Sequence, residues 1–509
     1  MDADEHQDEP HSRVILADAV IPIRYEYLTY ATDLSAWVPE EGSGGREIKA
    51  SPLSPWDSLP SLSQFDDPQN WSPGRKVFVT WLSCSTTFVT TYTPGAYAAG
   101  RPQYQAMWGL SDIAVYAGIT LFTLLFAVAP MFLASFSELT GRRPLFLAAG
   151  VVYVISQIGS GVTASFAGLL VTRALAGISC SVFSTVVGGV LSDIYAAKDR
   201  NTAMAIFTGA ALLGTGIGPL VSGVITEHIS WRWIYYVQAI SCGVVVLALF
   251  AFFPETRGSV LLSQKAKALN SWSESVLEDE NRKSTALMIK TALVRPLHLL
   301  FTESVVFWFS LWMSFAWSIL YLSFELVPLI FERAYQFSAQ GSGLVFAATA
   351  VASERIVTSP TSWFSNLALK GQPEARLVFA CVQSLLLPAG LFWLGATARP
   401  SIIYVVPTLS IASITLGIFS VYLAVFNYLA DSYHAYASSA IAAQSFTRNV
   451  FAAFLPLAAK PLLDSKLRIL GTGSLLGGIG LLLSIVPWVL VLWGPQIRDR
   501  SRFASKEPS

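Results

Sequence analysis

Apolar runs close to the length that crosses a bilayer recur almost throughout this 509-residue chain. A transmembrane helix needs about 20 consecutive, mainly apolar residues. The chain is 53% hydrophobic and only 13% charged, whereas soluble domains carry about 25% charged residues. We therefore predict a polytopic, all-α membrane protein. Its partners are then best sought in the charges of individual loops, because the formal net charge is zero.

The runs predict twelve membrane-spanning helices joined by short loops, with one long connection that divides them into two groups of six. We expect a disordered tail (1–75), an N-terminal bundle (76–253), a central loop (254–303), a C-terminal bundle (304–494) and a C-terminal tail (495–509). The predicted spans are 76–98, 109–132, 144–163, 165–191, 202–226, 232–253, 304–330, 341–362, 376–396, 401–429, 437–459 and 473–494.

Basic residues predict the orientation, because cytosolic loops carry an excess of Lys and Arg. Residues 1–75 lack the pattern of a signal peptide, so we place this tail in the cytosol. The loops and tails on that side then carry 23 of the 33 basic residues. Three more lie within spans, and the opposite loops hold only Arg101, Arg232, Arg333, Arg399, Lys460, Lys466 and Arg468. Both tails and the central loop are therefore predicted to be cytosolic.

Three segments of the N-terminal half have unusual chemistry. The loop SELTGRRP (137–144) combines Glu138 with the turn residue Gly141 and the pair Arg142 and Arg143; ordinary positive flanking is the alternative interpretation. The fourth span contains a charge, Arg173, in LLVTRALAG. The fifth span reads GAALLGTGIGPLVSG and contains Gly214, Gly218, Pro219 and Gly223. Small residues let membrane helices approach closely, and neighbouring groups can satisfy the backbone that Pro frees.

These three features, in this order and on these spans, resemble the signature motifs of the major facilitator superfamily, specifically its twelve-span drug:proton antiporters. Further segments resemble fungal exporters of drugs, polyamines and toxins: DDPQNWSPGRK (66–76), WRWIYYVQ (231–238), PETRGSVLL (254–262), FELVPLIF (324–331), PEARL (373–377) and YLADSYHAYASSAIAA (428–443). The resemblance implies two pseudo-symmetric six-helix bundles, proton-driven export by alternating access, and a functional monomer. It also implies that Arg173 takes part in proton coupling and that Glu138, Gly141, Arg142 and Arg143 form a conformational latch.

The sequence departs from these relatives at three places. Ala134 stands where the first motif begins with Gly, and Ala176 where many antiporters have Gln. The eighth span is interrupted by Glu354 and Arg355 and followed by Pro360. A functional ion pair, a local helix break and an error in the gene model are the three explanations for that irregularity.

An antiporter needs a group that gains and loses a proton, and a buried carboxyl is suited to this because burial favours its neutral form. Glu325 in the seventh span is our first candidate. A role in binding a cationic substrate and a purely structural role are its alternatives. Asp193 and Asp431 lie at cytosolic span ends, where we expect solvated side chains. For Arg173 the alternative is structural pairing with backbone carbonyls or a polar neighbour.

A substrate cavity is expected near the midplane between the two bundles. Aromatic faces suit flat or cationic organic molecules, although aromatic residues in spans also serve as packing. Arg448 could bind an anion, pair with an acid of the other bundle, or brace the tenth span. The cavity candidates are Tyr92, Tyr97, Trp312, Trp317, Tyr321, Asn427, Gln444 and Arg448.

Other classes of function lack their sequence features. The five His and four Cys form no ligand cluster, and no GxxxxGK[ST] motif is present, so we expect no metal, no cofactor, no ATPase and no enzyme. The expected partners are a small organic substrate, protons and the lipid bilayer, without nucleic acid. Proton-coupled uptake, polyamine export and a non-transporting sensor remain alternatives. We expect the plasma membrane, with the vacuolar membrane as the alternative; the substrate itself cannot be read.

Overall fold

The computed structural model describes residues 15–16, 19–20, 65–196, 199–273, 285–358, 374–433, 436–499, 501 and 503. The chain forms two compact units, 1–70 with 258–283 and 71–257 with 284–509. The first unit contains the antiparallel strands β1 (Ile15–Leu16) and β2 (Ala19–Val20), the 3-10 helix η3 (Pro68–Asn70) and α8 (Gly258–Ser273). Most of the tail that we predicted to be disordered lies outside the described residues.

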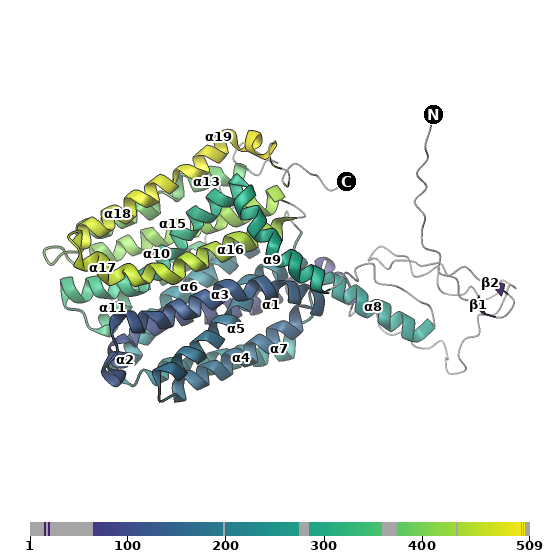
Figure 1. Cartoon of the computed structure of the whole chain (residues 1–509), viewed down its shortest axis with the longest axis horizontal. Helices are drawn as coiled ribbons and strands as arrows, with labels where there is room; N and C mark the ends of the chain where they lie inside the picture. The colour runs from purple at the N-terminus through teal and green to yellow at the C-terminus, as the bar shows by residue number, and fades with distance from the viewer. Residues whose placement is uncertain are drawn as a thin grey trace. The chain divides into compact units, whose positions relative to one another are not determined.

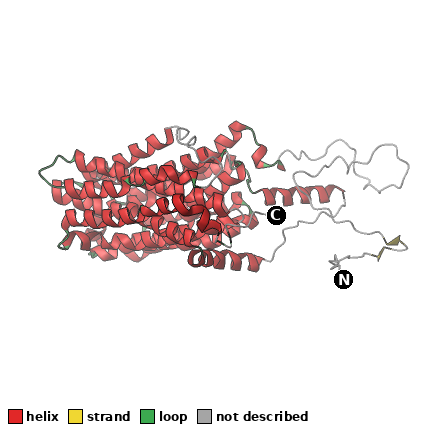
Figure 2. Ribbon diagram, turned by 90° about the horizontal axis from the view of Figure 1, so that it is seen from above, coloured by secondary structure: helices red, strands yellow, loops and turns green. Residues whose placement is uncertain are grey.

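The second unit is built of helices that run side by side along the body (Figures 1 and 2). Its N-terminal half contains α1 (Pro73–Ala99), α2 (Arg101–Trp108), α3 (Asp112–Thr140), α4 (Arg142–Val162), α5 (Phe166–Ile194), α6 (Arg200–His228) and α7 (Arg232–Phe252). Its C-terminal half contains α9 (Thr285–Thr302), α10 (Ser304–Tyr335), α11 (Ala339–Val345), α12 (Ala347–Thr358), α13 (Ala375–Gln383), α14 (Leu386–Thr397), α15 (Val405–Tyr433), α16 (Ala437–Phe454), η6 (Leu455–Ala458), α17 (Ala459–Asp464), α18 (Arg468–Leu483) and α19 (Ile485–Asp499).

Each of the predicted spans contains helix. Within the described ranges, nine helices are long and apolar enough to cross a membrane. The other three spans are occupied by α1, which is rich in Thr, by α11 with α12, and by α16. The prediction of an all-α chain of membrane-crossing helices is therefore confirmed, and its largest irregularities are short breaks such as that at Phe346 between α11 and α12.

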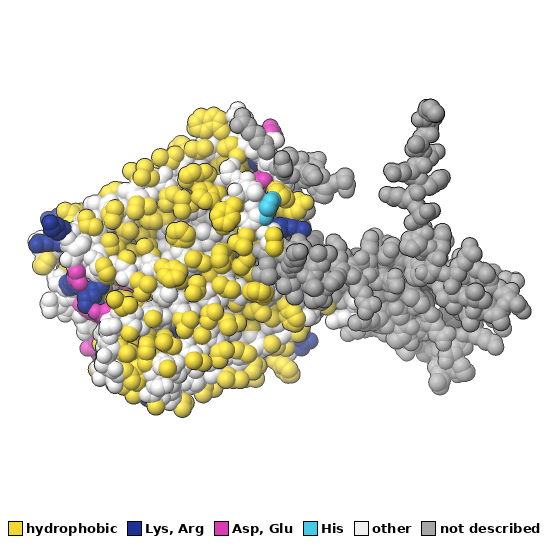
Figure 3. All heavy atoms as spheres, in the orientation of Figure 1, with side chains coloured by type: hydrophobic (Ala, Val, Ile, Leu, Met, Phe, Trp, Pro, Cys, Tyr) yellow, Lys and Arg dark blue, Asp and Glu magenta, His cyan; other side chains and the backbone are white. Residues whose placement is uncertain are grey.

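The surface of this body has the distribution expected in a bilayer. On the face that Figure 3 shows, apolar side chains are spread over the side of the body, whereas charged side chains gather mainly at its two ends. Ile155, Leu247 and Phe250 are all more than 60% exposed, which suits contact with lipid tails. We call the end that carries Gly141 and Arg257 the cytosolic end, and the end that carries α2 and α17 the external end, following the predicted orientation.

Three groups of contacts join the two halves. Helix α6 packs against α11, α12 and α15, α3 packs against α9, α16 and η6, and α1 meets α10. Thr120 Oγ1 on α3 donates a hydrogen bond to the carbonyl of Ala453 near the end of α16 (2.9 Å). The residues between the halves are therefore those on α1, α3, α6, α9, α10, α11, α12, α15, α16 and η6.

Candidate functional site

Arg173 lies on α5, where it is 1% exposed. Its guanidinium carbon is 4.5 Å from the ring centroids of both Tyr97 and Phe122. Nε and Nη1 each lie 3.5 Å from a carbonyl oxygen, that of Gly118 on α3 and that of Thr93 on α1. Nη2 has no hydrogen-bond partner among the described residues. Arg173 thus joins α5 to α1 and α3 through aromatic faces and long carbonyl contacts, without a carboxylate partner in the described part of the chain.

Glu325 lies on α10 and is 2% exposed. Its Oε2 is 3.6 Å from Nη1 of Arg101, at the start of α2 in the other half. Nη2 of the same arginine is 3.4 Å from Oε2 of Glu332, and Nη1 donates to the hydroxyl of Tyr116 (3.2 Å). Glu325 Oε1 has no partner in the described ranges. The carboxyl of Glu325 therefore takes part in an ion pair between the halves.

Arg101 remains positively charged in this setting. Burial disfavours its charged form, but Glu325, Tyr116 and Glu332 act in the opposite direction, and together they raise the pKa of Arg101 above its ordinary value. Any change of charge in this cluster near neutral pH must therefore occur on a carboxyl group rather than on the guanidinium group.

Two further polar contacts close the external end around this ion pair. Lys460 on α17 forms an ion pair with Asp112 at the start of α3. The backbone N–H of Gln340 lies 3.4 Å from Glu227 Oε2, and the Gln340 side chain lies 3.1 Å from the His228 ring. All three groups of contacts connect the N-terminal half to the C-terminal half, and we interpret this arrangement as a closed external end.

The glycines of α6 serve two different interfaces. A Cβ at Gly214 or Gly218 would overlap backbone atoms of α1, next to Phe88 and Tyr92. On another face of the helix, a Cβ at Gly216 would lie 2.8 Å from the backbone nitrogen of Ala350 on α12. A Cβ at Gly223 would lie 2.7 Å from the carbonyl oxygen of Ala339 on α11. The motif therefore brings α6 close both to α1 in its own half and to the opposite half.

We expect Gly223→Ala to reduce transport by about tenfold or more, because overpacking costs about 1–3 kcal/mol and here it would press against the backbone of α11. The closed external end would be disfavoured, while each half could still fold. Initial transport rates and thermal stability in detergent measure the two effects separately. Gly188→Ala on α5 is the control, because a Cβ there meets no atom within 4 Å. Wild-type transport by Gly223→Ala would contradict this role for the close contact.

The loop between α3 and α4 is held at the cytosolic end by two carboxylates. Glu255 accepts hydrogen bonds from the backbone N–H groups of Arg142 (2.8 Å) and Arg143 (3.1 Å). Asp193 on α5 accepts from Nε of Arg142 (3.0 Å) and lies 3.4 Å from Nη1 of Arg257. These residues all belong to the N-terminal half, so the contacts fasten α3 and α4 to α5 and to the segment after α7.

Two of our expectations for this loop concerned Asp193 and Glu138. Asp193 was predicted to be solvated, but that prediction is wrong: its side chain is only 10% exposed and is ion-paired. Glu138 was predicted to partner the loop arginines, but its side chain lies outside the described residues. Arg143 was also predicted to belong to the latch, and its Nη2 donates a hydrogen bond to the carbonyl of Phe250 (3.1 Å).

Gly141→Ala should destabilise the protein more than an ordinary glycine substitution. Gly141 has φ 101° and ψ 164°, a conformation that is essentially restricted to glycine and costs other residues about 1–3 kcal/mol. A Cβ there would also overlap Glu255 Oε2. Gly109→Ala is the matched control, because Gly109 has φ 61° but open space around it. Thermal unfolding should show the larger loss for Gly141→Ala, and equal losses would mean that the contact with Glu255 is unimportant.

The C-terminal half has its own acidic clusters at the cytosolic end. Glu374 is buried and accepts from Nη2 of Arg498 (3.1 Å) and from the hydroxyl of Tyr428 (3.2 Å). Glu303 accepts from the hydroxyls of Tyr433 (3.2 Å) and Ser501 (2.6 Å). Both halves are therefore braced at this end by carboxylates, which are half-buried in the N-terminal half and buried in the C-terminal half.

The predicted cavity residues are buried or half-buried, and several have partners within their own half. The hydroxyl of Tyr92 lies 3.1 Å from Ser222 Oγ, and that of Tyr97 donates to the carbonyl of Val115 (2.8 Å). Trp312 packs against Phe309, and Asn427 is half-buried on α15. The other four, Trp317, Tyr321, Gln444 and Arg448, lie on α10 and α16, which pack closely.

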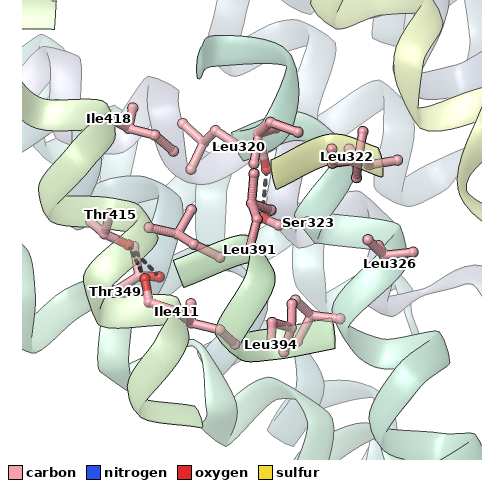
Figure 4. A pocket seen from close by; sticks show the side chains of 14 residues that line it. Leu320, Leu322, Ser323, Leu326, Thr349, Leu391, Leu394, Ile411, Thr415 and Ile418 are labelled. Atoms are coloured by element: carbon pink, nitrogen blue, oxygen red, sulfur yellow. Dashed lines mark hydrogen bonds between the residues drawn. The ribbon is translucent and has the colours of Figure 1, made fainter. Parts of the chain in front are cut away.

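The pocket in Figure 4 does not contain these candidates. Its lining comes from α10, α12, α14, α15 and α18, all in the C-terminal half. The lining is almost wholly apolar, and its polar groups include Ser323 and the hydrogen-bonded hydroxyls of Thr349 and Thr415 (3.2 Å). With no charged group to orient a solute, we interpret it as a packing gap within one half.

Sequence reasoning missed four residues of these clusters as partners: Arg101, Asp193, Glu255 and Glu374. Glu255 and Glu374 lie in segments that resemble fungal exporters, PETRGSVLL and PEARL. That resemblance was the available signal for them. Arg101 is one of few basic residues on the external side, which was a weaker signal. The side chains of Glu354 and Arg355, in the irregular eighth span, lie outside the described residues.

Comparison with known proteins adds an independent result. Residues 78–456 match the family model of the Major Facilitator Superfamily. The chain is 31% identical to the efflux pump FUBT of Fusarium oxysporum, over 87% of this chain and 77% of that protein. It is 30% identical to the MFS-type efflux pump MFS2 of Trichophyton rubrum, over 96% and 84%. It is 28% identical to the multidrug transporter FLR2 of Candida glabrata, over 88% and 80%.

Solved structures show the same fold at low sequence identity. The proton:xylose symporter XylE has a TM-score of 0.60 and 13% identity, covering 83% of this chain and 97% of its own. A POT family transporter in complex with a thioalcohol-conjugated peptide has a TM-score of 0.61 and 12% identity, covering 86% and 99%. At this identity, the likeness concerns the arrangement of helices alone.

Proposed function

Because the chain belongs to the major facilitator superfamily and is a multi-pass membrane protein, we propose that it exports small organic molecules in exchange for protons. Its relatives include proteins named as efflux pumps and a multidrug transporter. Proteins of this superfamily carry solutes rather than transform them. Alternating access is the mechanism that suits two halves packed around a midplane site.

The observation that carries the proposal is the buried ion pair between the halves, Arg101 with Glu325. In the externally closed form, the permanently charged guanidinium of Arg101 favours the ionised form of Glu325 relative to a form in which the two groups lie apart. When the external end opens, the two groups separate. The ionised form of Glu325 then loses its stabilising partner, so the carboxyl group takes up a proton from outside more readily.

Protonation of Glu325 and its ion pair with Arg101 exclude each other, and a transport cycle follows from this. A proton bound from outside neutralises Glu325 while substrate leaves. Closure of the external end brings Arg101 back and expels that proton towards the cytosol. Substrate then binds from the cytosol, and opening of the external end completes the exchange. One proton moves inward for each outward passage of substrate.

Other residues have supporting roles in this proposal. Arg173 joins α5 to α1 and α3 at the level of Tyr97, so it transmits changes at the external end into the N-terminal half. Gly216 and Gly223 permit the contact with α11 and α12 that closes the halves. Gly141, Arg142 and Arg143 keep the cytosolic ends of α3 and α4 together as a latch, with Asp193 and Glu255 as partners.

Reconstitution in liposomes with an imposed pH gradient tests the proposal. Rhodamine 6G, spermidine and an aromatic carboxylate serve as probes, with a liposome lacking the protein as the blank. We expect a probe to move opposite to the protons. Movement in the same direction as protons would favour uptake by symport, and no gradient-dependent movement of any probe would favour a sensor.

Two further properties complete the proposal. The contacts that hold the closed form lie between the two halves of one chain, which suits a functional monomer. We place the exporter in the plasma membrane, because export across it removes a harmful solute from the cell. The vacuolar membrane is the alternative, and fluorescence microscopy of a tagged protein would separate the two.

A further inference from the structure

Arg448 on α16 is a fully buried charge that the proposed cycle leaves unused. It is 0% exposed. Nη2 lies 3.4 Å from Ser445 Oγ on the same helix. Nε and Nη1 have no hydrogen-bond partner among the described residues. In that part of the chain, no carboxylate lies within ion-pair distance of this guanidinium group.

Aromatic rings enclose the guanidinium group from two helices. Its carbon is 4.6 Å from the ring centroid of Trp317 on α10. On α15 it is 4.9 Å from Tyr422 and 5.6 Å from Phe426. The rings of Tyr422 and Phe426 are stacked, with centroids 4.5 Å apart. These three rings and the guanidinium group form a buried aromatic cluster around a cation, which we call the Arg448 cluster.

Other polar atoms on the helices of the Arg448 cluster also lack partners among the described residues. Gln444 lies one turn before Arg448 on α16, and neither its amide oxygen nor its amide nitrogen has a partner among the described residues. The indole Nε1 of Trp317 also has no hydrogen-bond partner among the described residues, and neither has the hydroxyl of Ser314, one turn earlier on α10. Buried polar groups in proteins are normally hydrogen-bonded, so several unsatisfied donors in one place indicate a polar ligand.

Arg448 differs from Arg173, whose contacts connect neighbouring helices. Arg173 reaches carbonyls on two neighbouring helices, whereas the hydrogen bond from Arg448 to Ser445 stays on its own helix. Both arginines interact electrostatically with Tyr321 on α10. Helix α16 also packs against α3 of the opposite half. Separation of the halves would therefore open the side of α16 that faces α3, which gives a solute a route towards the Arg448 cluster.

We propose that Arg448 binds the carboxylate of an organic anion whose flat apolar body stacks against Trp317, Tyr422 and Phe426. This inference rests on the proposed export function and names its substrate class. A guanidinium group and a carboxylate can form two parallel N–H···O hydrogen bonds. The substrate carboxylate would neutralise a charge that is costly within the membrane. Gln444 and the indole N–H of Trp317 would supply further donors.

Binding to the purified full-length protein tests this inference without requiring transport. Isothermal titration would compare 1-naphthoate with 1-naphthamide, which has the same rings but no charge. Charged hydrogen bonds contribute about 1.5–3 kcal/mol, so Arg448→Met should weaken naphthoate binding by roughly tenfold to a hundredfold. Naphthamide binding should change by less than about twofold, and Arg448→Lys should restore part of the naphthoate affinity.

Control variants show whether a loss of naphthoate binding comes from loss of the binding group or from a folding defect. Arg399→Gln removes an exposed arginine of the same half and should leave naphthoate affinity unchanged. Thermal unfolding of Arg448→Met identifies a folding defect, and Trp317→Leu then provides a second test, because loss of its ring and N–H should weaken naphthoate binding. Equal binding of naphthoate and naphthamide, no naphthoate binding, or unchanged naphthoate binding by Arg448→Met would each overturn the anion site.

The two proposals can fail separately. If naphthoate binds through Arg448 but a pH gradient never moves it, proton-coupled export fails while the anion site stands. If a pH gradient drives rhodamine 6G outward but naphthoate neither binds nor competes, the anion site fails while export stands.

Discussion

Replacing Glu325 by Gln is expected to abolish proton-driven export. The substitution keeps the size of the side chain but removes both the charge that pairs with Arg101 and the group that carries the proton. The pH gradient should then no longer drive accumulation in liposomes. Some substrate exchange without a gradient should persist, because the halves can still alternate even though the externally open form predominates. Loss of the ion pair should also weaken external closure by up to about 3 kcal/mol.

Glu332→Gln is the matched control for this experiment. Glu332 lies on the same helix and contacts the same arginine, but its side chain is 37% exposed. A more solvated carboxyl contributes less to the pairing, so this variant should keep gradient-driven transport within about threefold of wild type. Retention of proton-driven export by Glu325→Gln would remove Glu325 from the role of proton carrier.

Arg173→Met should separate function from stability. A buried ionised side chain costs at least about 2.5–3.5 kcal/mol on membrane-insertion scales, and Met retains much of the apolar stem. The variant should therefore unfold at the same or a higher temperature than wild type. Transport should nevertheless fall by at least about tenfold, because α5 would lose the cation–π contacts with Tyr97 and Phe122 that link it to α1 and α3.

Arg232→Met provides the opposite case. Arg232 stacks on Trp231 and donates to the carbonyls of Gly161 and Thr163 at 2.8 and 2.7 Å, and it lies at a helix end. Here we expect lower thermal stability with intact proton coupling in the protein that remains folded. A stability loss for Arg173→Met that matches its transport loss would assign Arg173 a structural role only.

The helices were predictable because the bilayer imposes a length and an apolar composition on each of them. The break at Phe346 in the eighth span and the short helix α17 were not, because no rule of length or hydropathy marks them. Hydropathy located α10 and therefore placed Glu325 inside the membrane. It gave no indication of which side chain would face Glu325.

The partners were harder to predict than the charged residues themselves. Arg101 and Glu325 are separated by more than two hundred positions in the chain, so their contact depends on how the halves pack. Asp193 was misjudged for a related reason: its position at a span end suggests solvent, but Arg142 and Arg257 cover it. The close approach of α6 was easier to anticipate, since glycines at small spacings permit little else in a membrane helix.

The central claim is that protonation of Glu325 and closure of the external end exclude each other. Spin labels on cysteines at positions 107 and 467, replacing Met107 in the N-terminal half and Leu467 in the C-terminal half, would report that closure. Both side chains are exposed at the external end (48% and 40%), and the buried native cysteines would first be replaced. We predict that acidification lengthens the distance between the labels in the otherwise wild-type protein, and that Glu325→Gln gives the long distance at every pH. A distance that ignores pH in the wild type, or the same pH response in Glu325→Gln, would contradict the account.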